Sequence, residues 1–279
     1  MSHAVRGFHS LLDYDTHASS VHRWLHDRVG ILHRDLSLNN IMCRIIKEKN
    51  KAGVREIKEV YGVLTDYDLS SWTASLTSNY TKTSQQRTGT PPFMAHGLLD
   101  GSDTLHLYRH DVESLFYIIL ILATRYEIEA PKKGNAGGVR TRQGLKVLPY
   151  QAWFDQPSYE TLAESKQAFI SNLKYLNLSP TFEDFRGWLE DLHLSFQTGF
   201  ISKQIHRRDL LSLQRRRGGT SEGRVIPTFD NETLAGHIQY SALVDPASSL
   251  KGGLEGLIVR YKPSPSSPPT STGAAKADS

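Results

Sequence analysis

The sequence predicts an α+β fold that is mostly helical and carries one short β-hairpin near its N-terminus. Two short β-branched runs, Ile41 to Ile46 and Val60 to Leu64, follow each other closely, as in paired strands. Leu115 to Leu122 is apolar on nearly all sides, which is typical of a helix at the centre of a domain. Two amphipathic stretches, about 158–176 and about 182–197, predict further helices.

The elements before the hairpin can be read in order. Residues 17–29 predict a helix, because Val21, Trp24, Leu25 and Val29 recur at helical spacing and Gly30 then provides a stop. The charged stretch from Lys47 to Glu59 separates the two β-branched runs. We therefore expect a hairpin with a long polar connection.

Polar and flexible segments separate the later elements. Residues 70–90 are rich in Ser and Thr and predict a mobile surface segment. Glycine, lysine and arginine between Lys132 and Lys146 predict a flexible insertion. The tail after residue 262 has no apolar residue larger than alanine. One domain over residues 1–262 and a disordered tail over 263–279 are therefore expected.

Composition limits the partners and the compartment. The formal net charge of +4 is too small to demand nucleic acid as a partner. The single cysteine, Cys43, excludes an internal disulfide framework. The longest apolar stretch, Leu115 to Ala123, is shorter than the roughly 20 residues that span a bilayer, and the start has no signal-peptide layout. We expect a cytoplasmic or nuclear protein without membrane contact.

The most informative motif is a run of three residues, His33-Arg34-Asp35, followed five positions after the aspartate by Asn40. This is the H-R-D-x-x-x-x-N spacing of a protein-kinase catalytic loop. Phosphoryl transfer from ATP needs a carboxylate that accepts the proton of the acceptor hydroxyl and a nearby oxygen ligand for magnesium. Asp35 suits the first role, and Asn40 suits the second.

Three further landmarks follow in the order that protein kinases use. The apolar run from Gly62 leads to Asp66 at the position of the D-F-G aspartate. Residues 87–95, with the sequence RTGTPPFMA, resemble the end of an activation segment, and residues 110–115, HDVESL, resemble the start of the central buried helix.

The forms that these kinase motifs take in this sequence together resemble the fungal-type protein kinase family. Ser37 two positions after Asp35, Asp68 in place of the D-F-G glycine, and the late segment FDNETLAGH at 229–237 all match that family. The resemblance implies a protein-kinase-like fold in which residues 1–262 form the mostly helical large (C-terminal) lobe. The catalytic loop would be 33–40 and the activation segment 66–97.

The resemblance also implies a function, an ATP-dependent protein kinase acting on serine or threonine hydroxyls. Asp35 would be the catalytic base, with His33 bracing the loop through hydrogen bonds. Asn40 and Asp66 would bind Mg²⁺ and ATP. Arg34 would pair with a phosphate on the activation segment, for which the sequence offers residues 81, 83, 84 and Thr88, and Thr90 belongs to the same segment.

Some kinase features are missing from this sequence. Only thirty-two residues precede His33, and they contain neither a glycine-rich loop nor a lysine-bearing strand. His96-Gly97 stands where an A-P-E glutamate would lock the segment to the lobe. We therefore expect a large lobe without its small lobe, with little activity alone and with Leu36, Ile41 and Leu64 partly uncovered.

Two alternatives to a protein kinase remain open. A non-catalytic interaction module is favoured by the missing small-lobe sequence, but the presence of Asp35, Asn40 and Asp66 opposes it. A small-molecule kinase would share an H-x-D-x-x-x-x-N loop. The stretch at 87–95 opposes that alternative, because it resembles a segment that docks peptides.

Overall fold

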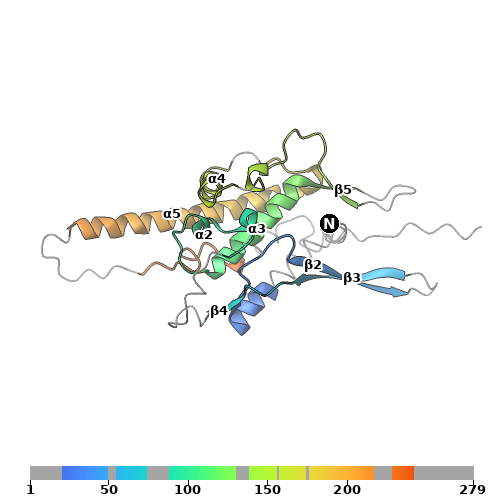
Figure 1. The fold of residues 1–279 in the computed structure, drawn as a ribbon, viewed down its shortest axis with the longest axis horizontal. Coiled ribbons are helices and arrows are strands. Elements are labelled where there is room, and N and C mark those ends of the chain that lie inside the picture. Colours follow the sequence, from blue (N-terminus) through green and yellow to red (C-terminus); the bar gives the residue numbers. More distant parts are fainter. Residues whose placement is uncertain are drawn as a thin grey trace, which may run out of the picture.

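The computed structural model of the protein describes residues 21–49, 55–73, 88–129, 138–155, 157–173, 176–216 and 228–241. Within these ranges, helices combine with three two-stranded antiparallel sheets, which confirms the predicted α+β class (Figure 1). No helix in these ranges is both long enough and apolar enough to span a bilayer.

The first described element is the helix that the apolar spacing predicts. A helical turn over residues 21–24 continues as the π-helix η2 (Leu25–Val29). Gly30 ends it with a left-handed conformation, φ 73°, which glycine adopts without steric cost. The chain then enters β1 (Ile31–Leu32), which pairs with β4 (Ser71–Trp72).

The predicted hairpin is present and is longer than the β-branched runs. Strand β2 (Ile41–Lys49) pairs with β3 (Arg55–Leu64), with Ile41 opposite Leu64. A register shift follows Ile46, yet pairing continues through the charged residues, which we had expected in the connection. That expectation was wrong, because ladder hydrogen bonds extend a strand whose side chains lack β propensity.

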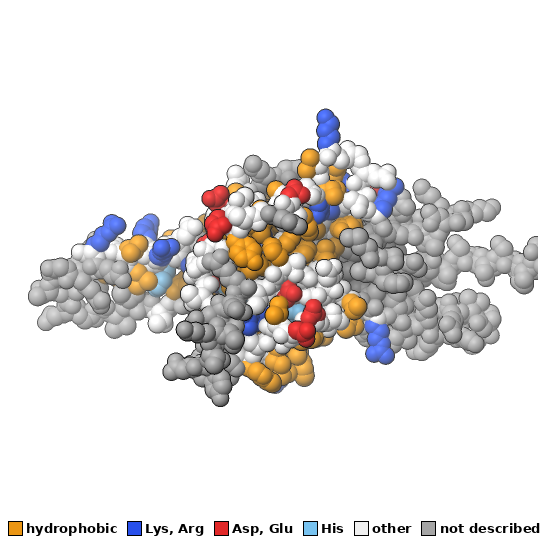
Figure 2. All heavy atoms as spheres, in the orientation of Figure 1, with side chains coloured by type: hydrophobic (Ala, Val, Ile, Leu, Met, Phe, Trp, Pro, Cys, Tyr) orange, Lys and Arg blue, Asp and Glu red, His pale blue; other side chains and the backbone are white. Residues whose placement is uncertain are grey.

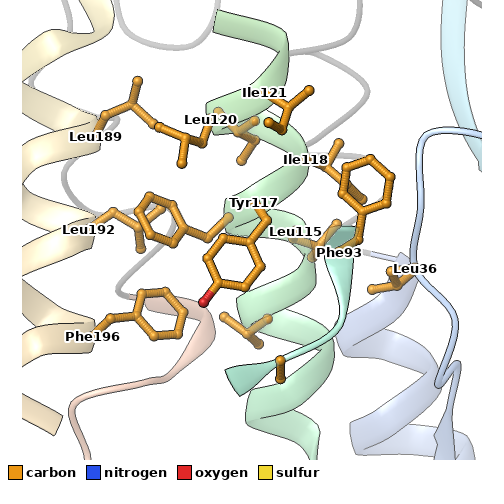
Figure 3. Close-up of a cluster of buried hydrophobic side chains, with 14 of the residues drawn as sticks. Leu36, Phe93, Leu115, Tyr117, Ile118, Leu120, Ile121, Leu189, Leu192 and Phe196 are labelled. Carbon is orange, nitrogen blue, oxygen red and sulfur yellow. The ribbon is translucent and has the colours of Figure 1, made fainter. Parts of the chain in front are cut away.

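Helix α3 (Tyr108–Arg125) is the centre of the fold, and all of its residues are buried. Figure 3 shows Leu189, Leu192 and Phe196 of α5 on one side of α3, with Phe93 and Leu36 on the other. Phe116 stacks on Phe196 with ring centroids 5.1 Å apart. The unbroken apolar run in the sequence therefore correctly predicted a helix that is enclosed all round.

The remaining elements surround α3. The segment before it contains η5 (Pro91–Phe93) and α2 (His96–Leu99). After it come β5 (Tyr126–Glu129) and β6 (Gly138–Thr141), which form a hairpin where we had expected only a flexible insertion. The later elements are η6 (Gln151–Trp153), α4 (Tyr159–Ser171), η7 (Pro180–Phe185) and α5 (Arg186–Arg216).

The molecular surface is mixed in character on the face shown. Figure 2 shows hydrophobic side chains gathered near the middle of this face, with acidic side chains on two sides of them. Leu36, Ile41 and Leu64 are not part of any exposed patch, because each is at most 6% exposed. The expectation that these three side chains are partly uncovered was wrong, since they belong to the same core as α3.

Residues 228–241 pack against the start of α3. The carboxylate of Glu232 accepts the backbone N–H of Tyr108 at 2.8 Å, and Arg109 donates to the carbonyl of Asn231 at 2.7 Å. A carboxylate near the first turn of a helix is favoured by the helix dipole and by the unpaired N–H groups there. Leu234 and Ile238 are fully buried, so this segment is part of the core.

A buried carboxylate, Asp103, joins the start of α3 to α5. It accepts hydrogen bonds from four side chains: Arg109 at 2.5 Å, Lys203 at 2.7 Å, His110 at 3.2 Å and Asn231 at 3.4 Å. Burial by itself would raise the pKa of Asp103, but the hydrogen bond from His110 and the charge of Arg109 hold this pKa below its ordinary value. Asp103 is therefore ionised and paired inside the protein.

This arrangement predicts a specific cost for a small substitution, Gly97→Ala in α2. A Cβ at this position would lie 1.8 Å from the Asp103 carboxylate, which its partners keep in place. We expect a loss of about 1–3 kcal/mol in unfolding free energy from overpacking, which exceeds the gain of up to about 1 kcal/mol from helix propensity. Urea denaturation monitored by circular dichroism measures the change.

Gly187→Ala is the matched control for this experiment. Gly187 lies in α5, and within the described ranges no atom other than those of its chain neighbours and its own helix backbone lies within 4 Å of the position that its Cβ would occupy. This substitution should stabilise the protein slightly, as helix propensity alone predicts. Equal effects of the two substitutions would contradict the described contact between Gly97 and Asp103.

The buried histidines predict that stability falls as the pH falls below neutral. Burial lowers the pKa of His110 to about 3, and it also lowers the pKa values of His33 and His193. Because an unfolded histidine titrates near pH 6.5, protons bind preferentially to the unfolded chain between that pH and the folded pKa. The contribution of these histidines to the free energy of unfolding is therefore fully present above about pH 6.5. Below that pH the free energy of unfolding decreases, by up to about 1.4 kcal/mol per pH unit for each such group.

Urea midpoints measured at successive pH values from 7 to 4 test this dependence. The variant His110→Gln should show a shallower decline than the original protein, because one of the preferentially protonated groups is removed. A stability profile that is flat over this range would contradict the assignment of buried neutral histidines.

Candidate active site

The turn at His33-Arg34-Asp35 is held by the buried carboxylate of Asp111, near the start of α3. Its Oδ2 atom accepts the backbone N–H of His33 at 2.9 Å, and its Oδ1 atom accepts that of Arg34 at 3.1 Å. Arg34 has φ 70°, a left-handed conformation that costs a non-glycine residue roughly 1–2 kcal/mol. The two hydrogen bonds therefore stabilise a strained backbone next to Asp35.

Two histidines complete the environment of Asp111. His22 Nε2 lies 2.9 Å from Oδ2, and His106 Nε2 lies 2.8 Å from Oδ1. Burial by itself would raise the pKa of Asp111, but the charge and hydrogen bond of His106, together with those of His22, hold it well below its ordinary value. The ionised carboxylate thus connects the first described helix, the His33–Asp35 turn and α3.

Asp35 is connected to both Asn40 and Thr90. Asn40 Nδ2 donates to the backbone carbonyl of Asp35 at 2.8 Å and to its Oδ2 atom at 3.2 Å. Thr90 donates its backbone N–H at 2.7 Å and its hydroxyl at 2.8 Å to Oδ1. The structure therefore brings these three sequence-predicted residues together. The bonds from Asn40 and Thr90 orient the Asp35 carboxylate before any substrate binds.

Asp66 follows the end of β3 and has an exposed carboxylate. Its neighbour Thr65 donates its backbone N–H to the Asn40 carbonyl at 2.9 Å and accepts a hydrogen bond from His33 Nε2 at 3.0 Å. The pairing of Ile41 with Leu64 explains this proximity, because Asn40 and Asp66 lie just beyond the same end of the hairpin. Asp66 also has a left-handed backbone, φ 64°.

His33 braces this group from inside the protein. Burial lowers the pKa of its imidazole, although the charge of Asp111 and the bond to Thr65 act in the opposite direction. A neutral ring that donates from Nε2 to the Thr65 carbonyl has Nδ1 as an acceptor, and the backbone N–H of Asp35 lies 3.4 Å from Nδ1. His33 thereby joins the residue before Asp66 to Asp35 itself.

The segment from residue 88 onward closes one side of Asp35. A narrow space between this segment and the turn is lined by Arg34, Asp35, Thr88 and Thr90, among others, and is too narrow to hold a water molecule. Gly89 has φ 129° and approaches Met94 so closely that a Cβ would lie 2.9 Å from its Cγ. A glycine is therefore required here for two separate steric reasons.

Only one of the candidate phosphorylation residues lies in the described ranges. Residues 81, 83 and 84 lie outside the described ranges, whereas Thr88 lies within them. Arg34 is 6% exposed and lines the same space as Thr88. No cluster of three His, Cys, Asp or Glu side chains that could hold a metal ion occurs in the described part of the chain.

Sequence reasoning missed the buried residues that hold the segments of the site in place. It placed the His110–Leu115 stretch at the start of a central helix, yet it assigned no role to Asp111 or Glu113 and did not identify His106 or Lys166. All four side chains are buried. For Asp111 and Glu113 the available signal was their position directly before the apolar run of α3, because charged residues are rarely buried without a partner. His106 and Lys166 lie outside α3, and no such signal marks them.

Comparison with known proteins relates part of the chain to one family. The fungal protein kinase family model matches residues 8–123, a segment that includes the turn at Asp35, the β2–β3 hairpin and most of α3. No curated protein matches the chain. Over residues 8–123, which are less than half of its 279 residues, the chain is therefore similar to the fungal protein kinase family.

Proposed function

We propose that the protein transfers the γ-phosphate of ATP to serine or threonine hydroxyls of a protein substrate, with residues 1–262 as the large lobe of a protein kinase. The match of residues 8–123 to the fungal protein kinase family suggests a kinase-like function. The observation that carries the more specific proposal is the joint orientation of the Asp35 carboxylate by Asn40 and Thr90.

In this proposal Asp35 is the general base. Its Oδ1 atom accepts two hydrogen bonds from Thr90, and its Oδ2 atom accepts one from Asn40. These bonds fix the carboxylate plane, so that it can accept the proton of an incoming hydroxyl without first reorganising. The contact with Thr90 also supports a peptide substrate, because Thr90 belongs to the stretch that resembles a peptide-docking segment.

Asn40 and Asp66 would bind Mg²⁺. The Nδ2 atom of Asn40 is used by Asp35, so the amide oxygen is the atom that Asn40 has for a metal ion. The exposed carboxylate of Asp66 supplies a second hard oxygen ligand. Mg²⁺ commonly takes one or two protein oxygens together with phosphate oxygens and water, so a larger protein cluster is not needed. Bound Mg²⁺ would neutralise charge on the ATP phosphates.

Arg34 would pair with a phosphate on the activation segment. Among the candidate acceptors, Thr88 is the one in the described ranges, and it lines the same narrow space as Arg34. Because this space is too narrow even for a water molecule, a phosphate on Thr88 would require the segment to move away from the turn, and it would then add charge-assisted hydrogen bonds to the buried Arg34 guanidinium group. Mass spectrometry of the protein isolated from its cells would identify modified residues in this segment.

Phosphate transfer from γ-labelled ATP to a library of peptides tests the proposed function. The intact protein, meaning the chain joined to a protein-kinase small lobe, should with Mg²⁺ label serine and threonine but not tyrosine, and Asp66→Asn should abolish the labelling. Asp68→Asn is the matched control, because Asp68 is also exposed and lies two residues further on. Labelling that survives Asp66→Asn would contradict the proposal, and an absence of labelling would favour a non-catalytic interaction module.

A further inference from the structure

Lys166 of α4 is a fully buried lysine that contacts the segment closing the active site. Its side chain is 0% exposed, and its ammonium group donates a hydrogen bond to the backbone carbonyl of Met94. The Nζ atom lies 4.0 Å from the centroid of the Tyr117 ring and 5.1 Å from that of the Trp153 ring. Both distances are within the range of cation–π attraction.

Glu113 of α3 contacts the same segment with the opposite charge. Its Oε1 atom accepts the backbone N–H of His96 at 2.7 Å and the hydroxyl of Tyr117 at 2.6 Å. Burial lowers the pKa of Lys166, and the charge of Glu113 opposes this shift. Residues 94–96 are thus bonded at one end by a donor from α4 and at the other by an acceptor from α3.

A continuous path of bonds leads from Lys166 to Asp35. The carbonyl of Met94 accepts from Lys166, and the backbone N–H of Met94 donates to the carbonyl of Thr90 at 3.1 Å. Thr90 in turn donates its own N–H and hydroxyl to Asp35. Between Thr90 and Met94 the chain forms the single 3-10 turn η5. Because this turn is short and hydrogen-bonded, a shift of Met94 would also move Thr90.

We propose that Lys166 is a positioning residue, which fixes residues 90–96 so that Thr90 keeps the Asp35 carboxylate oriented. A buried lysine is expensive, since desolvation of an ammonium group costs several kcal/mol. An apolar side chain of similar length would fill the same space without this cost. The advantage of lysine here is its directional bond to a backbone carbonyl. The catalytic consequence, though not the positioning itself, rests on the proposed function.

Amide hydrogen exchange of Lys166→Met, measured by NMR without nucleotide, tests the proposal. Methionine retains the length and apolar stem of lysine but cannot donate to the Met94 carbonyl. We expect exchange at Thr90, Phe93 and Met94 to accelerate about tenfold, the factor expected when a hydrogen bond to a charged group is lost. Amides in the interior of α3 should exchange as before.

Glu164→Met is the matched control, because Glu164 is exposed on the same helix, α4. It should leave the exchange of residues 90–94 unchanged.

A second variant, Glu113→Gln, should accelerate exchange at His96 by weakening the acceptor on the other side. In the intact protein, Lys166→Met should lower kcat about tenfold with nucleotide affinity unchanged, if an orienting bond to Asp35 is lost.

Two results would overturn the proposal. One is a folded Lys166→Met variant whose exchange at residues 90–94 equals that of the original protein. The other is uniform acceleration throughout the protein, or global unfolding, in both Lys166→Met and Glu113→Gln, which would make these side chains general core contacts. Because the exchange is measured without nucleotide, a negative result there leaves the proposed phosphate transfer unaffected. Conversely, if the protein shows no phosphate transfer, faster exchange in Lys166→Met would still support the positioning role of Lys166.

Discussion

Asp35→Asn in the intact protein should reduce phosphate transfer by about 10²-fold or more, the usual loss when a general base is removed. Asparagine has nearly the same shape, and its Oδ1 atom can still accept the two hydrogen bonds from Thr90. The substitution therefore removes the proton acceptor and the 3.2 Å hydrogen bond from Asn40 to Oδ2, but it keeps the bonds that hold the Thr90 segment. Initial rates at saturating ATP and substrate measure the loss in kcat.

The melting temperature and the NMR spectrum of Asp35→Asn serve as controls for its folding. Both should be close to those of the original protein, because Asp35 is a partly buried residue at the edge of the core. Turnover within a few fold of the original, in a variant that is folded normally, would show that Asp35 is not the base.

Asp111→Asn should lower the free energy of unfolding by about 3–5 kcal/mol, the range for removing one member of a buried charge network. The carboxylate accepts hydrogen bonds from the backbone of His33 and Arg34 and lies within hydrogen-bonding distance of His22 and His106. An amide would turn one acceptor into a donor that faces other donors. We also expect the NMR signals of the His33–Asp35 turn to broaden or disappear.

Urea denaturation of Asp111→Asn alongside Asp184→Asn measures this effect. Asp184 is exposed on η7, so its substitution should change stability by no more than about 0.5 kcal/mol. A loss for Asp111→Asn as small as that of the control would contradict the role of Asp111 as the support of the turn.

Local patterns in the sequence predicted most of the regular structure. The apolar run Leu115–Leu122 lies in α3, and the two β-branched runs pair as β2 and β3. The spacing of Asp35 and Asn40 correctly indicated neighbours, because only four residues separate them and they are joined by a hydrogen bond. These features depend on short-range periodicity, which a single sequence displays directly.

The buried polar contacts could not be predicted in the same way. Asp111 binds residues 77 and 78 positions earlier, and Lys166 binds Met94 across 72 positions. Nothing in the local pattern indicates which distant backbone group a buried charge will meet. The ends of β2 and β3 were missed for a related reason, since charged residues join a strand when its partner is long enough to pair with them.

Binding of Mg²⁺·ATP to the 279-residue chain tests the central claim, that Asn40 and Asp66 form one nucleotide-metal site beside Asp35. Titration calorimetry with Asn40→Leu, Asp66→Asn and the control Asp68→Asn would measure it. The account predicts saturable binding that requires Mg²⁺, is lost in the first two variants and is retained in the control. The absence of binding at millimolar nucleotide, or equal binding by all the variants, would contradict it.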